Sequence, residues 1–163
     1  MNVLVLRKVL VEQPEPHRGE GMQVVRVDLL AAGAEWLALR NRAFRDENPP
    51  VRPWTPADLH REFGPASRAR DRVTWLARDV AAGPPAVCGA VSISLPRPAS
   101  EAASLHWLMV DPDYRGRGIG SLLLGTAERH CWERGHRVLR LETHRGWEKA
   151  VRFYIRHEYQ AGR

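Results

Sequence analysis

The sequence predicts an α+β fold in one domain, and three observations lead to this prediction. The chain has 163 residues, enough for one domain with a sizeable hydrophobic core. From residue 22 onward, its strand-like and helix-like segments follow the order β-α-α-β-β-β-α-β-α. Between residues 105 and 124, an apolar strand leads into a glycine-rich turn and then at once into a helix.

The first half of this domain begins with a strand over 22–27 and a helix that Asp28 caps. The apolar positions expected to face the core from this helix are Leu30, Ala34, Leu37 and Phe44. A polar, proline-rich loop over 45–54 follows. Thr55 then opens a second helix that reaches about Phe63, with a proline in its first helical position.

The second half contains most of the predicted sheet. Two strands are joined as a hairpin by residues 81–85, and Gly135 stops the longest helix. The strands are expected over 73–80, 86–94, 101–110 and 138–144, and the helices over 118–134 and 146–157.

Residues 1–21 are expected to be an N-terminal extension outside the domain, which spans 22–163. Residues 3–11 are apolar enough for a strand, but 13–16 and 19–21 have loop sequences. Met22 is an alternative start of translation.

Composition excludes several classes of protein. No apolar run approaches the ~20 residues that span a bilayer, and no signal peptide is evident, so we expect a cytoplasmic protein without membrane partners. The net charge is +6, but arginines alternate with acids, as in Arg68, Arg70, Asp71 and Arg72, and no nucleic-acid recognition motif is present. Cys88 and Cys131 lie in apolar segments without metal-site spacing, so buried thiols and no metal are predicted.

The turn after the 101–110 strand predicts a pyrophosphate site. Arg115, Gly118 and Gly120 form the pattern R-x-x-G-x-G, directly before a helix whose first N–H groups attract anions. A P-loop is excluded because no lysine lies between Lys8 and Lys149. A dinucleotide fingerprint is excluded because Ser121 occupies the position of its third glycine.

This strand–turn–helix unit resembles the acetyl-CoA pyrophosphate motif of the GCN5-related N-acetyltransferase (GNAT) superfamily. Val110-Asp111-Pro112 precedes the turn and Ser121-Leu122-Leu123-Leu124 follows it, and the resemblance covers about residues 22–159. It implies a mixed sheet in which the parallel strands 101–110 and 138–144 splay apart around acetyl-CoA. The residues that would hold acetyl-CoA are Leu108, Met109, Val110, Arg115, Gly116, Arg117, Gly118, Ile119, Gly120 and Ser121.

The resemblance also assigns catalytic roles for acetyl transfer from acetyl-CoA to a primary amine of a small molecule or peptide. The N–H of Leu108 resembles the group that polarises the thioester carbonyl, and Tyr154, in A-x-x-F-Y, resembles the acid that protonates the leaving thiolate. Strand alternation places Ser104, His106, Leu108 and Val110 on one face, where His106 is the candidate base. Glu142, His144, an acid near Ser104 or a water chain are the alternatives for that base.

Two residues depart from the family pattern. Trp147 stands where relatives often have an asparagine that contacts the cofactor, and Glu158 where they usually have glycine. A non-catalytic or degenerate acyl-CoA binder is therefore the alternative function.

The resemblance stops early at the C-terminal end of the sequence, where relatives complete the acceptor cleft. Relatives continue past the last helix into further strands, whereas this sequence ends soon after Tyr159. Hence we expect a truncated product or a homodimer in which a partner chain supplies the missing strand. The 45–54 loop offers Asp46, Glu47, Arg52 and Trp54 to an amine acceptor, or is simply solvated. Residues 39–59 are also similar to the mycothiol synthase branch.

Overall fold

The computed structural model describes residues 2–16, 19, 21–48, 50–64, 72–82 and 86–162. Arg68, Arg70, Asp71 and positions 83–85 of the predicted hairpin turn lie outside the described residues. The described strands are β1 (Val3–Val9), β2 (Met22–Val27), β3 (Arg72–Asp79), β4 (Ala86–Ser94), β5 (Ala103–Val110), β6 (Val138–His144) and β7 (Gln160–Ala161). The described helices are α1 (Leu29–Ala43), α2 (Pro56–Phe63), the short η1 (Pro112–Tyr114), α3 (Ile119–Glu133) and α4 (Glu148–Arg156).

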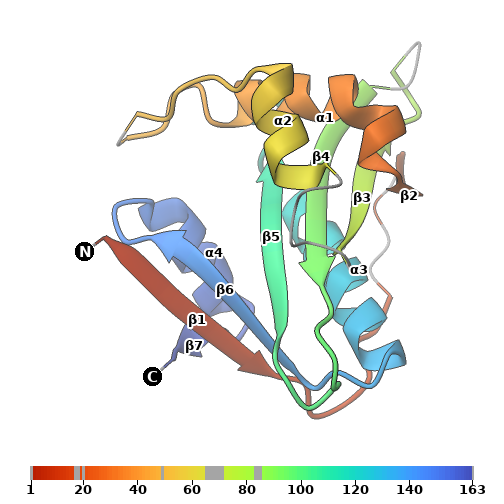
Figure 1. Cartoon of the computed structure of the whole chain (residues 1–163), viewed down its shortest axis with the longest axis vertical. Coiled ribbons are helices and arrows are strands. Elements are labelled where there is room, and N and C mark those ends of the chain that lie inside the picture. The colour runs from red at the N-terminus through yellow and green to blue at the C-terminus, as the bar shows by residue number, and fades with distance from the viewer. Residues whose placement is uncertain are drawn as a thin grey trace.

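One mixed sheet joins these strands in the order β2-β3-β4-β5-β6-β1-β7 (Figure 1). Every neighbouring pair is antiparallel except β5 and β6, which are parallel. That parallel pair is joined only where Ala103–Leu105 meets Leu139–Leu141. Beyond Leu105 the two strands diverge, which confirms the splayed strands that the family resemblance implied.

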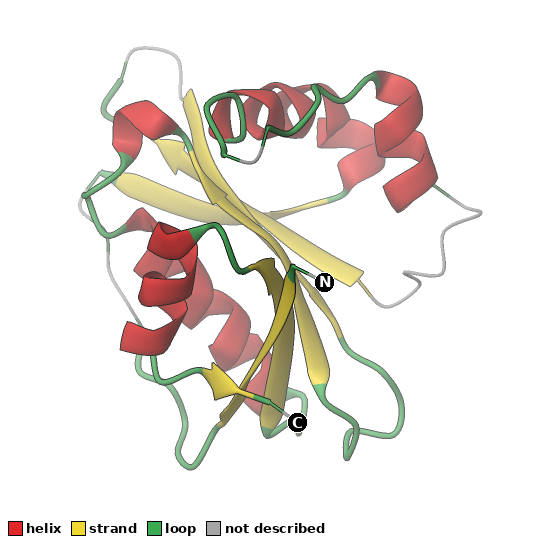
Figure 2. Cartoon of the chain, turned by 90° about the vertical axis from the view of Figure 1, so that its left-hand side faces the viewer, coloured by secondary structure: helices red, strands yellow, loops and turns green. Residues whose placement is uncertain are grey.

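Helices cover both faces of the sheet (Figure 2). On one face, α1 packs on β4 and β5 around a buried cluster that includes Trp36, Leu76 and Met109. On the other face, α3 packs on β3, β4 and β5, and α4 packs on β6. None of the described helices is long and apolar enough to cross a membrane.

Both cysteines are buried thiols of the larger core, as predicted. Burial raises the pKa of Cys88 to about 11 and that of Cys131 to about 12, so both stay protonated at neutral pH.

The N-terminal strand corrects the expected domain organisation. β1 pairs with β6 along its whole length, from Val3 opposite His144 to Val9 opposite Val138. The predicted open edge beside residues 138–144, with a strand missing or supplied by a partner, is therefore wrong for this chain. Leu6 is only 1% exposed, and Lys8 forms an ion pair with Glu128 of α3 at 2.7 Å. Val3–Val9, within the expected N-terminal extension, thus form a strand of the same sheet as the rest of the chain.

The buried face of α1 differs from the prediction in part: Leu37 and Phe44 pack against the core cluster as expected, whereas Leu30 and Ala34 are exposed. Leu30 is 69% exposed, and the buried positions are Leu29, Gly33, Trp36, Leu39, Arg40 and Ala43. Asp28 caps the helix as predicted, with its side chain accepting from the N–H of Leu30. The face is rotated because the fully buried Trp36 decides which side of the helix meets the sheet, and because the backbone leaves helical geometry at Ala32.

Candidate active site

A bulge in the middle of β5 shapes the site. Opposite β4, His106 pairs with Ser92 and Met109 with Ala90, so two residues, Trp107 and Leu108, face a single residue of β4. Trp107 takes a positive φ of 53°, a strained value for a large side chain.

The bulge overturns the predicted alternation along β5. Leu105 and Leu108 both pack on the core under α3, whereas Trp107 packs on the cluster under α1. Because the extra residue shifts the phase, His106 and Leu108 lie on opposite faces of the strand. The expectation that Ser104, His106, Leu108 and Val110 share one face is therefore wrong.

The divergence of β5 and β6 opens a cleft of about 1250 Å³. It is lined by most of β5, the turn after η1 with the start of α3, one face of α4, the second half of β6 and the loop after α1. Since pairing with β6 stops at Leu105, the backbone of Leu108, Met109 and Val110 has no neighbouring strand among the described residues on the cleft side. The N–H of Leu108 has no strand-pairing partner on the β4 side either.

The glycine-rich turn closes one end of the cleft. Gly116 and Gly118 have φ values of 80° and 79°, which favour glycine, and a Cβ at either position would meet no atom within 4 Å. Gly118 is the N-cap of α3 and offers no side-chain cap, so the first N–H groups of the helix stay open to a ligand. Gly120 serves packing instead, because its Cβ would approach the Phe153 ring of α4 to 3.2 Å.

Side chains around this turn have separate tasks. Arg115 lines the cleft and donates to the carbonyl of Ala43 at 3.0 Å. The Arg117 guanidinium lies over the Tyr114 ring at 4.7 Å and does not line the cleft. Ser121 lines the cleft, and its hydroxyl is 2.8 Å from His157 Nε2, which ties α3 to the end of α4. Ile119 lines the cleft and is buried in the core.

Tyr154 lines the cleft from α4 and is 9% exposed. Its ring packs against Phe153 and Tyr159 with centroid distances of 5.4 and 5.7 Å. Burial raises the pKa of its phenol well above the ordinary value of about 10, so the hydroxyl keeps its proton at neutral pH. A protonated phenol inside the cleft can donate a proton to an anion that forms there.

His106 and its predicted rivals do not all reach the cleft. His106, Ser104 and Glu142 line it, whereas His144 does not and accepts from the N–H of Gly146 at 2.9 Å. Burial, and then Arg72, lower the pKa of His106, against Glu62 and Glu142, which raise it. The imidazole is therefore neutral at neutral pH and able to accept a proton.

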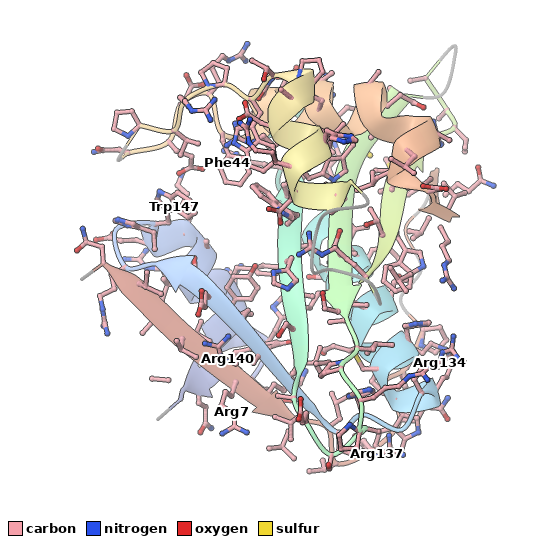
Figure 3. The ribbon with its side chains drawn as sticks, viewed as in Figure 1. Arg7, Phe44, Arg134, Arg137, Arg140 and Trp147 are labelled. Carbon is pink, nitrogen blue, oxygen red and sulfur yellow. The ribbon has the colours of Figure 1, made fainter. Side chains whose placement is uncertain are left out.

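Two aromatic rings meet across the mouth of the cleft. Phe44, after α1, and Trp147, before α4, have ring centroids 5.7 Å apart, and Figure 3 shows them facing one another across the gap. The indole N–H of Trp147 is buried without a hydrogen-bond partner among the described residues.

One family model covers the segments that form this site. The acetyltransferase (GNAT) family model matches residues 34–159, which include the bulged strand, the glycine-rich turn and Tyr154. The chain belongs to the GNAT acetyltransferase family.

Individual relatives agree with this assignment. Over 56 residues the chain is 41% identical to an uncharacterized N-acetyltransferase of Methanocaldococcus jannaschii, a match that covers 34% of this chain and 25% of that protein. A GCN5-related N-acetyltransferase from Sphaerobacter thermophilus has a similar structure, with a TM-score of 0.74 at 19% identity, over 99% of this chain and 48% of that one. A GNAT-family acetyltransferase from Staphylococcus aureus has a TM-score of 0.68 at 16% identity, over 83% and 82% of the two chains.

These structural similarities show the fold alone. The compared proteins also differ from this chain in length. This GNAT chain spans about half the length of the Sphaerobacter protein and a quarter of the Methanocaldococcus protein. The narrower resemblance to mycothiol synthase stays a prediction.

Glu158 departs from the GNAT pattern in residue type but keeps a backbone that suits glycine. Its φ is 71°, in the left-handed region, immediately after α4. The chain therefore turns back toward β1 here, and Tyr159, which follows, is buried.

The end of the cleft beside α1 and α2 is lined by residues that the sequence reading missed. Arg40 and Glu62 both line the cleft, from α1 and α2. Glu62 accepts from Arg72 at 2.8 Å and from the Trp107 indole at 3.2 Å. Burial raises the pKa of Glu62, but the hydrogen bonds from Arg72 and Trp107, together with the charges of Arg72 and His106, lower the net pKa. No local sequence signal marks Arg40 or Glu62, because their neighbours in the site come from distant segments.

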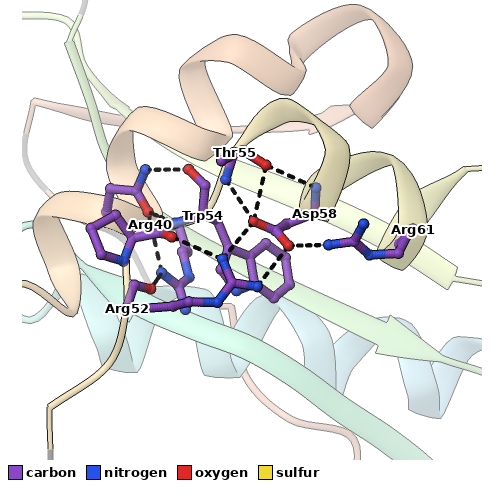
Figure 4. Close-up of polar contacts among 8 residues, drawn as sticks. Arg40, Arg52, Trp54, Thr55, Asp58 and Arg61 are labelled. Carbon is purple, nitrogen blue, oxygen red and sulfur yellow. Dashed lines mark hydrogen bonds and ion pairs between the residues drawn. The ribbon is translucent and has the colours of Figure 1, made fainter.

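The loop between α1 and α2 divides its predicted acceptor residues. Asp46 and Glu47 line the cleft, whereas Arg52 forms two hydrogen bonds with Asp58 at 2.8 and 2.9 Å. Trp54 packs on Trp107 and lies over the Arg40 guanidinium. Figure 4 shows Asp58 between Arg52 and Arg61, with Thr55 completing the capping box of α2.

Proposed function

We propose that this domain transfers an acetyl group from acetyl-CoA to a primary amine of a small molecule or peptide. The observation that carries the proposal is the parting of β5 from β6, which opens one cleft between a glycine-rich turn and the α1–α2 loop. Donor and acceptor entering from these two ends would meet beside the bulge of β5. Holding both reactants in one orientation removes much of the entropic barrier to their reaction.

The turn fits the pyrophosphate of acetyl-CoA. The backbone N–H groups of Gly116, Arg117, Gly118, Ile119, Gly120 and Ser121 would hold it, with Arg115 at the entry. The open space over Gly116 and Gly118 and the uncapped start of α3 support this assignment. The pantetheine amides would pair with Leu108, Met109 and Val110 as an added strand, because this edge of β5 has no neighbour among the described residues.

Three groups of this chain would then carry the chemistry. The N–H of Leu108 polarises the thioester carbonyl at the bulge. His106 takes the proton of the acceptor ammonium, since its lowered pKa keeps the imidazole neutral. Tyr154, whose phenol is protonated at neutral pH, donates its proton to the departing thiolate.

Trp147 supports a second candidate, an acyl-CoA binder that transfers nothing. This residue replaces the asparagine that relatives often direct at the cofactor, and it joins Phe44 across the mouth of the cleft. If that contact stays closed with acetyl-CoA bound, an acceptor cannot reach the acyl group.

Thermal unfolding with and without acetyl-CoA tests the binding half of the proposal. At ~100 times Kd the ligand should stabilise the wild type by about 2.7 kcal/mol, or roughly 5–10 °C in Tm. Gly118→Trp should lose this shift because the indole fills the turn. Gly135→Trp is the matched control, since Gly135 has a φ of 87° at the other end of α3. Absence of a shift in a cooperatively melting wild type would contradict the proposal.

Release of free CoA thiol on a panel of primary amines tests the transfer half. Turnover that falls about 10²-fold or more in Tyr154→Phe, with an unchanged acetyl-CoA shift, supports the enzyme and the role of the phenol. Binding without turnover on any amine favours the acyl-CoA binder.

A further inference from the structure

Arg40 is a buried guanidinium without an ion pair. The residue is only 3% exposed, and none of the salt bridges among the described residues includes it. Since an arginine stays charged in proteins, the structure holds a positive charge away from water beside the acceptor end of the cleft. Burying an unpaired charge is costly, so such groups usually have a partner.

The protein holds this guanidinium in place but leaves part of it unused. Nη1 donates to the carbonyl of Arg52 at 2.8 Å and to Asn41 Oδ1 at 3.2 Å. Nε is sealed inside the protein without a partner, and Nη2 has no hydrogen bond to the described residues. Three rings surround Cζ, with centroids at 4.7 Å for Trp54, 5.4 Å for Phe44 and 5.8 Å for Trp107.

Neighbouring charges do not neutralise Arg40. The nearby carboxylate, Asp58, already accepts from Arg52, Arg61 and Thr55 (Figure 4). Burial lowers the pKa of Arg40, Arg52 lowers it further, and Asp58 only partly opposes them. Glu62 is paired with Arg72. Asp46 and Glu47 also line the cleft, and neither forms an ion pair with Arg40 among the described residues. Arg40 therefore has no carboxylate partner among the described residues.

Trp107 connects the surroundings of Arg40 to the proposed reaction centre. Its ring forms one wall around the guanidinium, while its backbone forms the bulge next to the N–H of Leu108. A group bound at Arg40 and an amine reacting beside Leu108 would be separated by about one tryptophan side chain. His106, the proposed base, precedes Trp107 and lines the same cleft.

We propose that Arg40 binds an acid group of the acceptor, so that the acceptor carries both a primary amine and an anion. The inference rests on the proposed acetyl transfer. A carboxylate and a phosphate share the chemistry that a guanidinium recognises. The bound anion would supply the partner that Arg40 lacks, and the acceptor amine would then be directed toward the bulge.

The test compares matched amines with the full chain and acetyl-CoA. The carboxylate pairs are phenylalanine with phenylalaninamide and 4-aminobutyrate with butylamine, and the phosphate pair is 2-aminoethyl phosphate with ethanolamine. We expect a kcat/KM at least 10-fold higher for the acid member in one class of pair, which also identifies the anion. In Arg40→Met this preference should fall by about 10- to 100-fold, the range for a lost charge-assisted hydrogen bond.

Arg61→Met is the matched control, because it removes a nearby charge that does not line the cleft. It should keep the wild-type preference. Equal kcat/KM for both members of every pair in the wild type overturns the inference, and so does an equal loss for both members in Arg40→Met.

If Arg40→Met fails to fold, the wild-type preference and inhibition of the wild type decide. The N-acetyl product of the preferred acid amine should inhibit more strongly than the N-acetyl product of its neutral partner if the inference holds, and no better if it fails. If only the neutral amines are acetylated, the proposed acetyl transfer is supported and the inference about Arg40 is refuted. No acetylation of any amine refutes the proposed transfer itself.

Discussion

The pKa of His106 depends on the residues that surround its position in β5. It follows the three β5 residues that pair with β6, so its side chain lies where the cleft begins. Burial, then Arg72, lower its pKa, and Glu62 and Glu142 act in the opposite sense. A base is active in its unprotonated form, so activity that depends on His106 falls only when the pH drops below its lowered pKa.

We therefore predict that His106→Gln lowers kcat by about 10²-fold at neutral pH while acetyl-CoA binding is kept. The acid limb of the wild-type kcat/KM profile should lie below pH ~6.5, the ordinary histidine value, and the variant should lack this limb. The measurement is a pH–rate profile beside a thermal shift with acetyl-CoA. His144→Gln is the control, since His144 does not line the cleft. Unchanged kinetics in His106→Gln would remove this residue from the mechanism.

At the scale of elements, local sequence signals predicted most strands well. The bounds expected for residues 86–94 and 138–144 match β4 and β6, because glycine, proline and charged residues flank both apolar runs. The glycine-rich turn was equally predictable, since only glycine suits the left-handed backbone at Gly116 and Gly118. The assignment of these positions to acetyl-CoA remains a proposal.

Other features of the elements depend on distant partners and left no local signal. The face of α1 follows from packing Trp36 under rings that come from later segments. The bulge in β5 arises where Trp107 turns toward that cluster, and strict alternation could not anticipate it. For the same reason the sequence reading placed His106 and Leu108 on one face.

The end of α4 offers a prediction at this scale. Glu158 adopts a φ of 71°, a conformation that costs an L-residue about 1–2 kcal/mol relative to glycine. Glycine would relieve this strain but increases the freedom of the unfolded chain by about 0.4–1 kcal/mol. We expect Glu158→Gly to stabilise the protein by up to about 1 kcal/mol in chemical denaturation. Glu148→Gly, at the first turn of the same helix, should destabilise instead. Destabilisation by Glu158→Gly would show that the interactions of the Glu158 side chain contribute more to stability than its backbone strain costs.

For the whole molecule, β1 determines how β6 stands beside the cleft. β6 is joined to β5 over only three residues, whereas β1 pairs with all seven residues of β6. The N-terminal strand is thus the main support of one cleft wall, although the residues it pairs with lie 129 to 141 positions away in the sequence. Residues 3–9 had strand character in the sequence, but only the fold shows which strand they join.

This arrangement predicts that β1 is required for stability. Leu6→Ala should cost about 2–5 kcal/mol in the free energy of unfolding, because Leu6 is 1% exposed within the core. Val9→Ala, in the same strand at 62% exposure, should change it by no more than about 0.5 kcal/mol. Denaturant titration of both variants measures the difference. Equal effects would mean that β1 does not pack on the sheet. A large loss for Leu6→Ala together with a weaker acetyl-CoA shift would mean that the support of β6 also maintains the cleft, since Leu6 itself does not line it.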